Sequence, residues 1–178
     1  MSKAFTSEET APDPVVVRPR APLPVGVPNY VTRRGLQALH RELAELERER
    51  VTAEQGSGLG PEEQARAAAL ATRVTELAGR IHGAVLVDPP AGPTDEVRFG
   101  AIVTVVARDA EGRERRLQIV GVDEANGREG KVAFVAPIAR ALLGRRRGEL
   151  ATLRSPRGEE ELEVVDIEYD EPVDEHLR

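Results

Sequence analysis

Two adjacent acids, Glu62 and Glu63, are the residues of this sequence best suited to take part in chemistry. They follow a glycine-rich break at residues 56–60, so they would stand at the tip of the elements that flank it. Carboxylates on a rigid arm can share a Mg²⁺ ion with another protein's active site, because Mg²⁺ accepts a few carboxylates and keeps positions open for water. The alternative is helix-start electrostatics, which alone favours acids in a first turn.

Other catalytic and metal-binding classes lack the residues that they need. The 178-residue chain contains no cysteine, which excludes disulfides, thiol catalysis and cysteine zinc sites. Its three histidines, His40, His82 and His176, lie too far apart in the sequence to predict a histidine metal site. No nucleophile motif and no phosphate-binding glycine loop occurs. The sequence therefore predicts no catalytic constellation within the chain.

The charge pattern argues against direct binding to duplex DNA. The 25 basic and 31 acidic side chains give a net charge of −6, and no basic block is present to neutralise phosphates. The acidic excess lies at the C-terminal end, so residues 171–178 are expected to form an acidic tail. No apolar run approaches the roughly 20 residues of a membrane span, and the N-terminus lacks the apolar core of a signal peptide. We therefore expect a cytoplasmic protein with no membrane contact.

A helical hairpin is the element that would position the two acids. Apolar residues recur at spacings of three and four on both sides of the glycine-rich break, which is typical of two helices packed mainly on each other. The first stripe is Leu36, Leu39, Leu43 and Leu46, and the second is Ala67, Leu70, Val74, Leu77 and Ile81. Thr32 is suited to cap the first helix and Pro61 to begin the second. Residues 29–87 are therefore predicted to form an antiparallel coiled-coil hairpin rather than two helices on a larger core.

The regions on either side of the hairpin have different patterns. Six of the 13 prolines lie in the first 28 residues, which predicts a disordered tail at 1–28. After a linker at 88–93, apolar residues alternate with a period of two between turn residues. Strands are expected at 101–107, 115–120, 132–135, 150–154 and 161–169. Pro137 is expected to open a short helix at 138–143. The predicted fold class is α+β, with the hairpin followed by a small antiparallel sheet domain at 94–170.

Several segments of the chain resemble the bacterial GreA/GreB family of transcription elongation factors. The Tyr-x-Thr-x-x-Gly pattern at residues 30–35 resembles the start of the family's first helix. The more specific matches, in the family's order and spacing, are residues 97–101 (Val-Arg-Phe-Gly-Ala), 119–125 (Ile-Val-Gly-Val-Asp-Glu-Ala), 136–144 (Ala-Pro-Ile-Ala-Arg-Ala-Leu-Leu-Gly) and 163–169 (Glu-Val-Val-Asp-Ile-Glu-Tyr). The resemblance spans roughly residues 29–170 and leaves only the tails unmatched.

The resemblance implies an FKBP-like C-terminal domain that docks beside the secondary channel of RNA polymerase, and a hairpin that enters this channel. Two tip acids of the family help to hold a catalytic Mg²⁺ ion there for cleavage of backtracked RNA, so the factor has no cofactor or active site of its own. It further implies a monomer that meets nucleic acid only inside the polymerase. The residues expected to bind the partner are Asp123, Glu124, Ala136, Pro137, Ile138, Arg140 and Leu142.

This sequence departs from the family pattern in three places. The family tip reads Leu-Gly-Asp-x-x-Glu-Asn, whereas here the two acidic positions fall on Pro61 and Gln64. Each helix is about two turns shorter than usual, which removes roughly 11 Å of reach. The serine that caps the family's short helix is Ala136 here, a loss worth about 1 kcal/mol. We therefore predict a polymerase-binding regulator of elongation that stimulates transcript cleavage weakly or not at all.

Other functions remain open at this point. The protein could be a cleavage factor of the GreB type that uses Glu62 and Glu63, or a non-transcriptional regulator of the Rnk type. It could also be a helical-hairpin adaptor for another protein. FKBP-like domains are also found in prolyl isomerases, but that chemistry needs an aromatic pocket, and the region offers only Phe99, Phe134 and Tyr169. Co-purification with core RNA polymerase would separate these classes.

Overall fold

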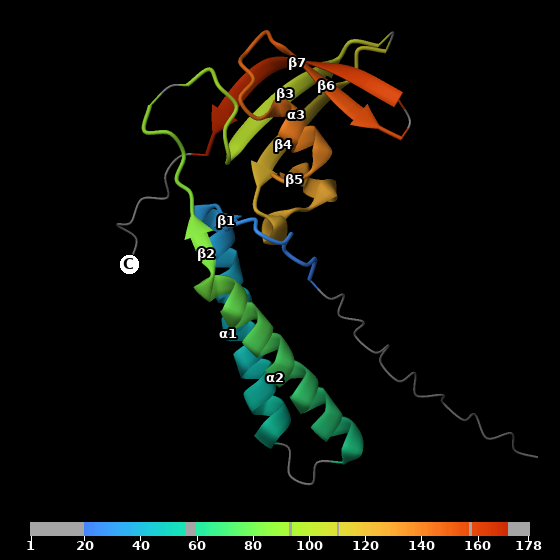
Figure 1. The fold of residues 1–178 in the computed structure, drawn as a ribbon. Helices are drawn as coiled ribbons and strands as arrows, with labels where there is room; N and C mark the ends of the chain where they lie inside the picture. Colours follow the sequence, from blue (N-terminus) through green and yellow to red (C-terminus); the bar gives the residue numbers. More distant parts are fainter. Residues whose placement is uncertain (1–19, 56–59, 93, 110, 157, 171–178) are drawn as a thin grey trace, which may run out of the picture.

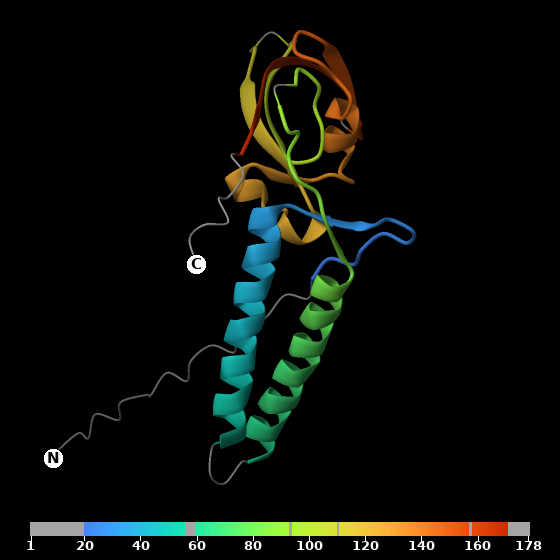
Figure 2. The same ribbon diagram turned by 90° about the vertical axis from the view of Figure 1, so that its left-hand side faces the viewer.

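A computed structural model describes residues 20–55, 60–92, 94–109, 111–156 and 158–170 of the chain. The chain forms a helical hairpin and a sheet domain, which stand end to end (Figures 1 and 2). The expected acidic tail at 171–178 and the first 19 residues of the expected N-terminal tail lie outside the described residues. Within the described part, no helix is long and apolar enough to cross a membrane.

The predicted coiled-coil hairpin is confirmed. It consists of α1 (Arg33–Gln55) and α2 (Pro61–His82), whose facing stripes bury Leu39, Leu46, Leu70 and Leu77. Thr32 caps α1 as predicted, because its Oγ1 accepts a hydrogen bond from the Gly35 amide at 2.9 Å. The hairpin therefore has a small core of its own.

The base of the hairpin contains a feature that the periodicity did not predict. Strand β1 (Asn29–Val31) pairs in parallel with β2 (Ala84–Leu86), so the segment entering α1 lies beside the one leaving α2. Strands of three residues are too short to give an alternating signal. Residues 20–28, predicted as part of the tail, precede β1 and lie at the same base (Figure 2).

The C-terminal domain is a five-stranded sheet in the order β5-β4-β3-β7-β6. Its strands are β3 (Ala101–Ala107), β4 (Glu114–Val120), β5 (Lys131–Ala133), β6 (Leu150–Ser155) and β7 (Gly158–Tyr169). All pairs are antiparallel as predicted, except that β4 and β5 run parallel, which makes the sheet a mixed one. The reason is the connection between them: two short 3-10 helices, η1 (Val122–Glu124) and η2 (Gly127–Glu129), carry the chain back before β5 begins.

A second hydrophobic core lies between the curled sheet and the short helix α3 (Pro137–Leu142). Alternate residues of β3 are buried along its whole length, as the period of two predicts. The helix contributes Ala139 and Leu142, both fully buried. Because this core contains no hairpin residue, the hairpin and the C-terminal domain are packed separately and meet only at the junction between them.

Candidate functional site

The hairpin tip carries the two acids at the first turn of α2, at the end of the hairpin that lies away from the sheet (Figure 1). Both side chains are exposed. Glu63 Oε2 accepts a hydrogen bond from the Gly60 amide at 3.1 Å, so Glu63 satisfies a backbone group that the helix start leaves free. Glu62 is its neighbour along the helix, and consecutive helical side chains point about 100° apart. The described residues contain no group of three or more acids or histidines able to hold a metal ion.

The segment around α3 brings together four of the residues expected to bind a partner. Pro137 is the first residue of the helix, and both it and Arg140 are exposed. Ile138 is half-buried against the core, and Ala136 is held by a 2.8 Å bond from its amide to the Ala133 carbonyl. These residues form one continuous surface at the start of α3.

Leu142 was also expected to bind the partner, but its side chain is fully buried in the core beneath this surface. Leucine at this position faces inward because it lies three residues after Ala139 on the same helix face. Its contribution is to fix α3 to the sheet rather than to contact another molecule.

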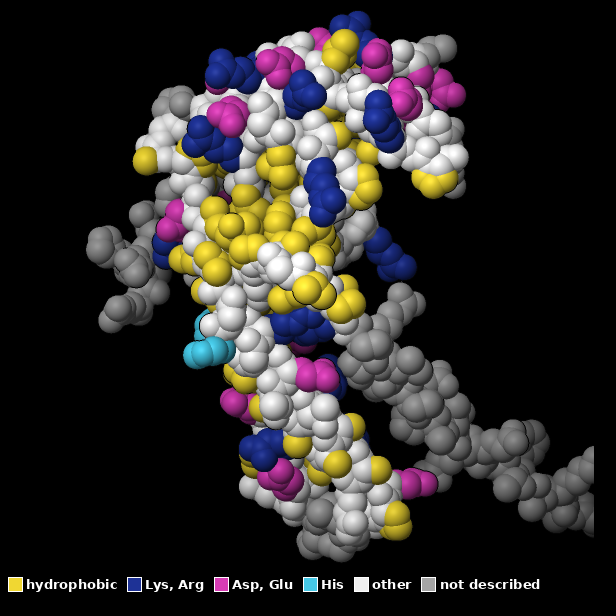
Figure 3. Space-filling view, viewed as in Figure 1, with side chains coloured by type: hydrophobic (Ala, Val, Ile, Leu, Met, Phe, Trp, Pro, Cys, Tyr) yellow, Lys and Arg dark blue, Asp and Glu magenta, His cyan; other side chains and the backbone are white. Residues whose placement is uncertain are grey.

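Hydrophobic side chains gather on the face of the C-terminal domain over the region of β4, β5 and α3 (Figure 3). The half-buried apolar residues that pack against the outside of the core here include Val132, Phe134, Ile138 and Leu143. Apolar side chains that are only partly covered on a domain surface are a feature of protein-binding faces.

Asp123 and Glu124, also expected to bind the partner, lie in η1 with their carboxylates engaged inside the chain. Glu124 accepts hydrogen bonds from the amide of Thr32 at 2.8 Å and from its hydroxyl at 2.5 Å. The Asp123 side chain is only 1% exposed and forms ion pairs with Arg20 at 3.3 Å and Arg80 at 3.5 Å. Both acids therefore join the C-terminal domain to the hairpin.

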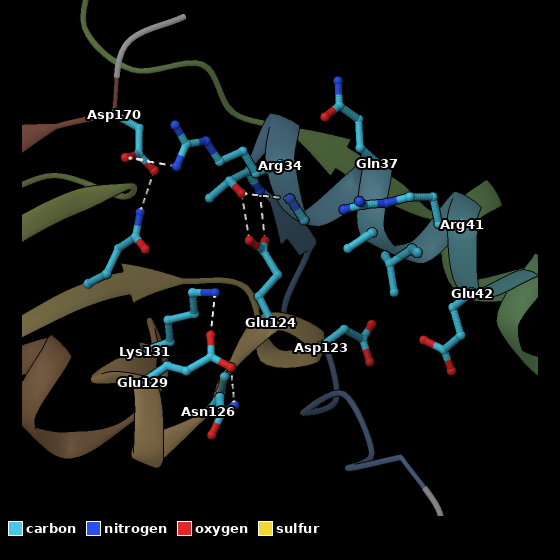
Figure 4. Close-up of a pocket in the computed structure, with 16 residues that line it drawn as sticks. Arg34, Gln37, Arg41, Glu42, Asp123, Glu124, Asn126, Glu129, Lys131 and Asp170 are labelled. Carbon is cyan, nitrogen blue, oxygen red and sulfur yellow. Dashed lines mark hydrogen bonds and ion pairs between the residues drawn. The ribbon is translucent and has the colours of Figure 1, made fainter. Parts of the chain in front are cut away.

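A polar cleft of about 540 Å³ lies beside this junction, between α1 and the C-terminal domain (Figure 4). Charged groups that line it form ion pairs: Arg34 with Asp170 at 3.3 Å, and Lys131 with its near neighbour Glu129 at 2.7 Å. The hydrogen bond and the charge of Lys131 lower the pKa of Glu129. Sequence reasoning missed this cleft because its residues come from distant segments. Its paired charges indicate a seam between domains rather than a reaction site.

The aromatic residues considered for an isomerase pocket have a different role. Phe99 and Phe134 pack on each other with ring centroids 5.8 Å apart, and Tyr30 of β1 packs on both, at 5.9 and 5.4 Å. The Phe99–Phe134 pair is edge-to-face and the two Tyr30 pairs are tilted, and aromatic pairs contribute about 0.5–1.5 kcal/mol each beyond burial. The rings therefore contact one another across the junction instead of lining an apolar pocket.

Comparison with known proteins identifies the family. The family model "Transcription elongation factor, GreA/GreB, C-term" matches residues 92–169. Transcription elongation factor GreB of Neisseria meningitidis serogroup A is 36% identical over 155 residues, which cover 79% of this chain and 94% of that protein. Transcription elongation factor GreA of Alkalilimnicola ehrlichii is 43% identical over 98 residues, covering 54% of this chain and 61% of that one. The solved structure of GreA factor homolog 1 from Thermus thermophilus is 23% identical, covers 78% of this chain and 97% of that chain, and has a TM-score of 0.37. The chain thus belongs to the GreA/GreB family of transcription elongation factors.

Proposed function

We propose that this elongation factor binds RNA polymerase through its C-terminal domain and places the hairpin in the secondary channel. There it regulates elongation with little or no stimulation of transcript cleavage. Any cleavage would be catalysed by the polymerase and its Mg²⁺, not by this chain. The observation that carries the proposal is the first turn of α2, which has Pro61 and Gln64 where the family resemblance implies carboxylates.

The chemistry of Mg²⁺ explains why these two positions matter. The ion takes oxygen ligands in near-octahedral geometry and prefers carboxylates among protein groups; a proline ring supplies no such oxygen and a neutral amide is a weaker ligand. Glu62 and Glu63 are the acids that remain in this turn, but they point in different directions and Glu63 is bonded to the Gly60 amide. A carboxylate pair that shares a helix face would be three or four residues apart.

The surface around α3 is where the C-terminal domain is expected to bind polymerase. Pro137 and Arg140 are exposed there, next to the half-buried Ile138 and the apolar face of Figure 3. Because this domain has its own core, residues 94–170 are expected to bind polymerase without the hairpin. Pro137→Asp and Ile138→Asp are expected to weaken binding, whereas Arg154→Asp, at an exposed position on the edge strand β6, serves as a charge control.

The deciding experiment adds the purified protein to a backtracked elongation complex and measures transcript cleavage. Wild type and Glu62→Ala/Glu63→Ala are expected to give equally low cleavage, while both bind polymerase. Pro61→Asp/Gln64→Glu, which restores acids at the family positions, tests whether the missing carboxylates or the shorter arm limits cleavage. Robust cleavage by wild type that disappears in the double alanine variant would overturn the proposal and favour the GreB-type alternative.

A further inference from the structure

The N-terminal segment at residues 20–28 lies across the base of the hairpin, where the hairpin meets the C-terminal domain (Figure 2). Arg20, its first described residue, pairs with Glu42 of α1 and with Asp123 of η1. A turn then reverses the chain into β1, with a 3.2 Å bond from the Val27 amide to the Pro24 carbonyl. The segment is thus tied at one end by Arg20 and at the other by the strand that it becomes.

The acid at the centre of these contacts is unusually enclosed. The side chain of Asp123 is only 1% exposed, and a buried carboxylate is costly unless cations compensate it. Its two oxygens face two arginines from different parts of the chain: Oδ1 faces Arg20 at 3.3 Å, and Oδ2 faces Arg80 of α2 at 3.5 Å. Arg80 also donates to the carbonyl of Ala21. The N-terminal segment, the hairpin and the C-terminal domain therefore meet at one carboxylate.

Arg20 remains charged in this position. Its partial burial acts to lower its pKa, but the hydrogen bond and charge of Glu42, together with Asp123, outweigh the burial and raise the pKa of Arg20. A guanidinium has several donors in a planar fork, so one side chain can reach two carboxylates at once, which an ammonium does less well.

We propose that Glu42 and Asp123 form a guanidinium-binding socket shared by the hairpin and the C-terminal domain. Arg20 fills this socket in cis, and residues 20–28 thereby act as a strap that sets the direction of the hairpin. One wall of the socket belongs to α1 and the other to η1, so a bound guanidinium resists rotation of one unit against the other. The strap holds the hairpin in the free protein, whether or not the factor binds polymerase or stimulates transcript cleavage.

The length of the hairpin makes this direction important. Helices of 23 and 22 residues reach about 33 Å from the base at 1.5 Å per residue. A rotation of roughly 10° at the base therefore moves the tip by roughly 6 Å, more than one helical turn. The ion pairs of Arg20 act together with the Glu124–Thr32 bonds and the Tyr30 ring contacts at this junction, and any loosening at the base is amplified at the tip.

Spin-label distance measurements test the strap directly, because the chain has no cysteine of its own. Cysteines replace the exposed residues Glu49 on α1 and Thr152 on β6. Arg20→Ala is expected to about double the width of the distance distribution between the labels, as for a released hinge. Arg50→Ala is the matched control, since Arg50 forms an ion pair with Glu54 within α1, and it is expected to leave the width unchanged.

Truncation and conservative variants complete the test. Removing residues 1–28 is expected to broaden the distribution as Arg20→Ala does, whereas removing 1–19 keeps Arg20 and leaves the width unchanged. Arg20→Lys is expected to give an intermediate width, and a wild-type width in this variant would overturn the guanidinium assignment. Glu42→Gln should add little to Arg20→Ala, because Glu42 and Arg20 act on one contact. Unchanged distributions in Arg20→Ala and in the longer truncation, with helical circular dichroism intact, would overturn the strap itself.

Discussion

Substitution of Gly35, in the first turn of α1, tests how closely the hairpin and the C-terminal domain approach each other. A Cβ atom added at this position would lie 1.9 Å from Cδ of Glu124, so Gly35→Ala must displace that carboxylate. The displacement breaks the two bonds that Glu124 accepts from Thr32, at a cost of about 2–3 kcal/mol for half-buried hydrogen bonds to a charged group. The better helix propensity of alanine stabilises the folded protein by about 1 kcal/mol and partly offsets this cost. The expected net loss is about 1–2 kcal/mol in the free energy of unfolding.

Gly79 in α2 is the matched control for this substitution. It also lies within a helix, but a Cβ atom there would meet nothing within 4 Å, so Gly79→Ala is expected to stabilise the protein by about 1 kcal/mol. Urea unfolding followed by helical circular dichroism measures both variants. If Gly35→Ala stabilised the protein as much as Gly79→Ala, the close approach of Glu124 to α1 would be refuted.

Three further predictions concern the C-terminal domain and the tail. Leu142→Ala is expected to lower the free energy of unfolding by about 2–4 kcal/mol through a cavity, whereas Arg140→Ala on the exposed face should change it by less than about 0.5 kcal/mol in the same urea titration. Burial raises the pKa of the Tyr169 hydroxyl above its ordinary value of 10.0. The stability that the neutral hydroxyl contributes is therefore fully present below pH 10.0 and is lost as the pH rises through the folded-state pKa. In thermal melts at increasing pH, Tyr169→Phe should not show this loss of stability. Deleting residues 1–19 should leave the melting temperature nearly unchanged, because a proline-rich chain buries little, and a drop of many degrees would contradict this.

The elements that could be predicted from the sequence are those whose pattern repeats locally. The leucine spacing of α1 and the alternation along Ala101–Ala107 follow from helix and strand geometry alone, and both appear where they were expected. The parallel pairing of β4 with β5 could not be found in this way, because strand direction depends on how η1 and η2 turn the chain. Three-residue strands such as β1 carry no periodic signal at all.

The junction could not be predicted for a different reason. The ion pairs of Asp123 join residues far apart in the sequence, and nothing near Arg20 indicates a partner. The proline-rich composition around Arg20 predicted a disordered tail, because composition carries no information about a single long-range ion pair. The family resemblance predicted Asp123 and Glu124 as partner-binding residues, whereas in the structure their carboxylates contact Thr32, Arg20 and Arg80 of the same chain.

Under the proposed function, the tip and the junction together determine what kind of effect this factor has. If the tip does not position Mg²⁺, its effect on polymerase comes from the space that the arm occupies, and side chains at the tip matter less than the direction of the arm. Glu62→Ala/Glu63→Ala is therefore expected to leave the effect on elongation rate nearly unchanged, whereas Arg20→Ala is expected to reduce it at equal polymerase occupancy. The converse result, with a large effect of the tip acids and none of Arg20, would mean that the acids act on the polymerase chemistry and that the strap has no role in transcription.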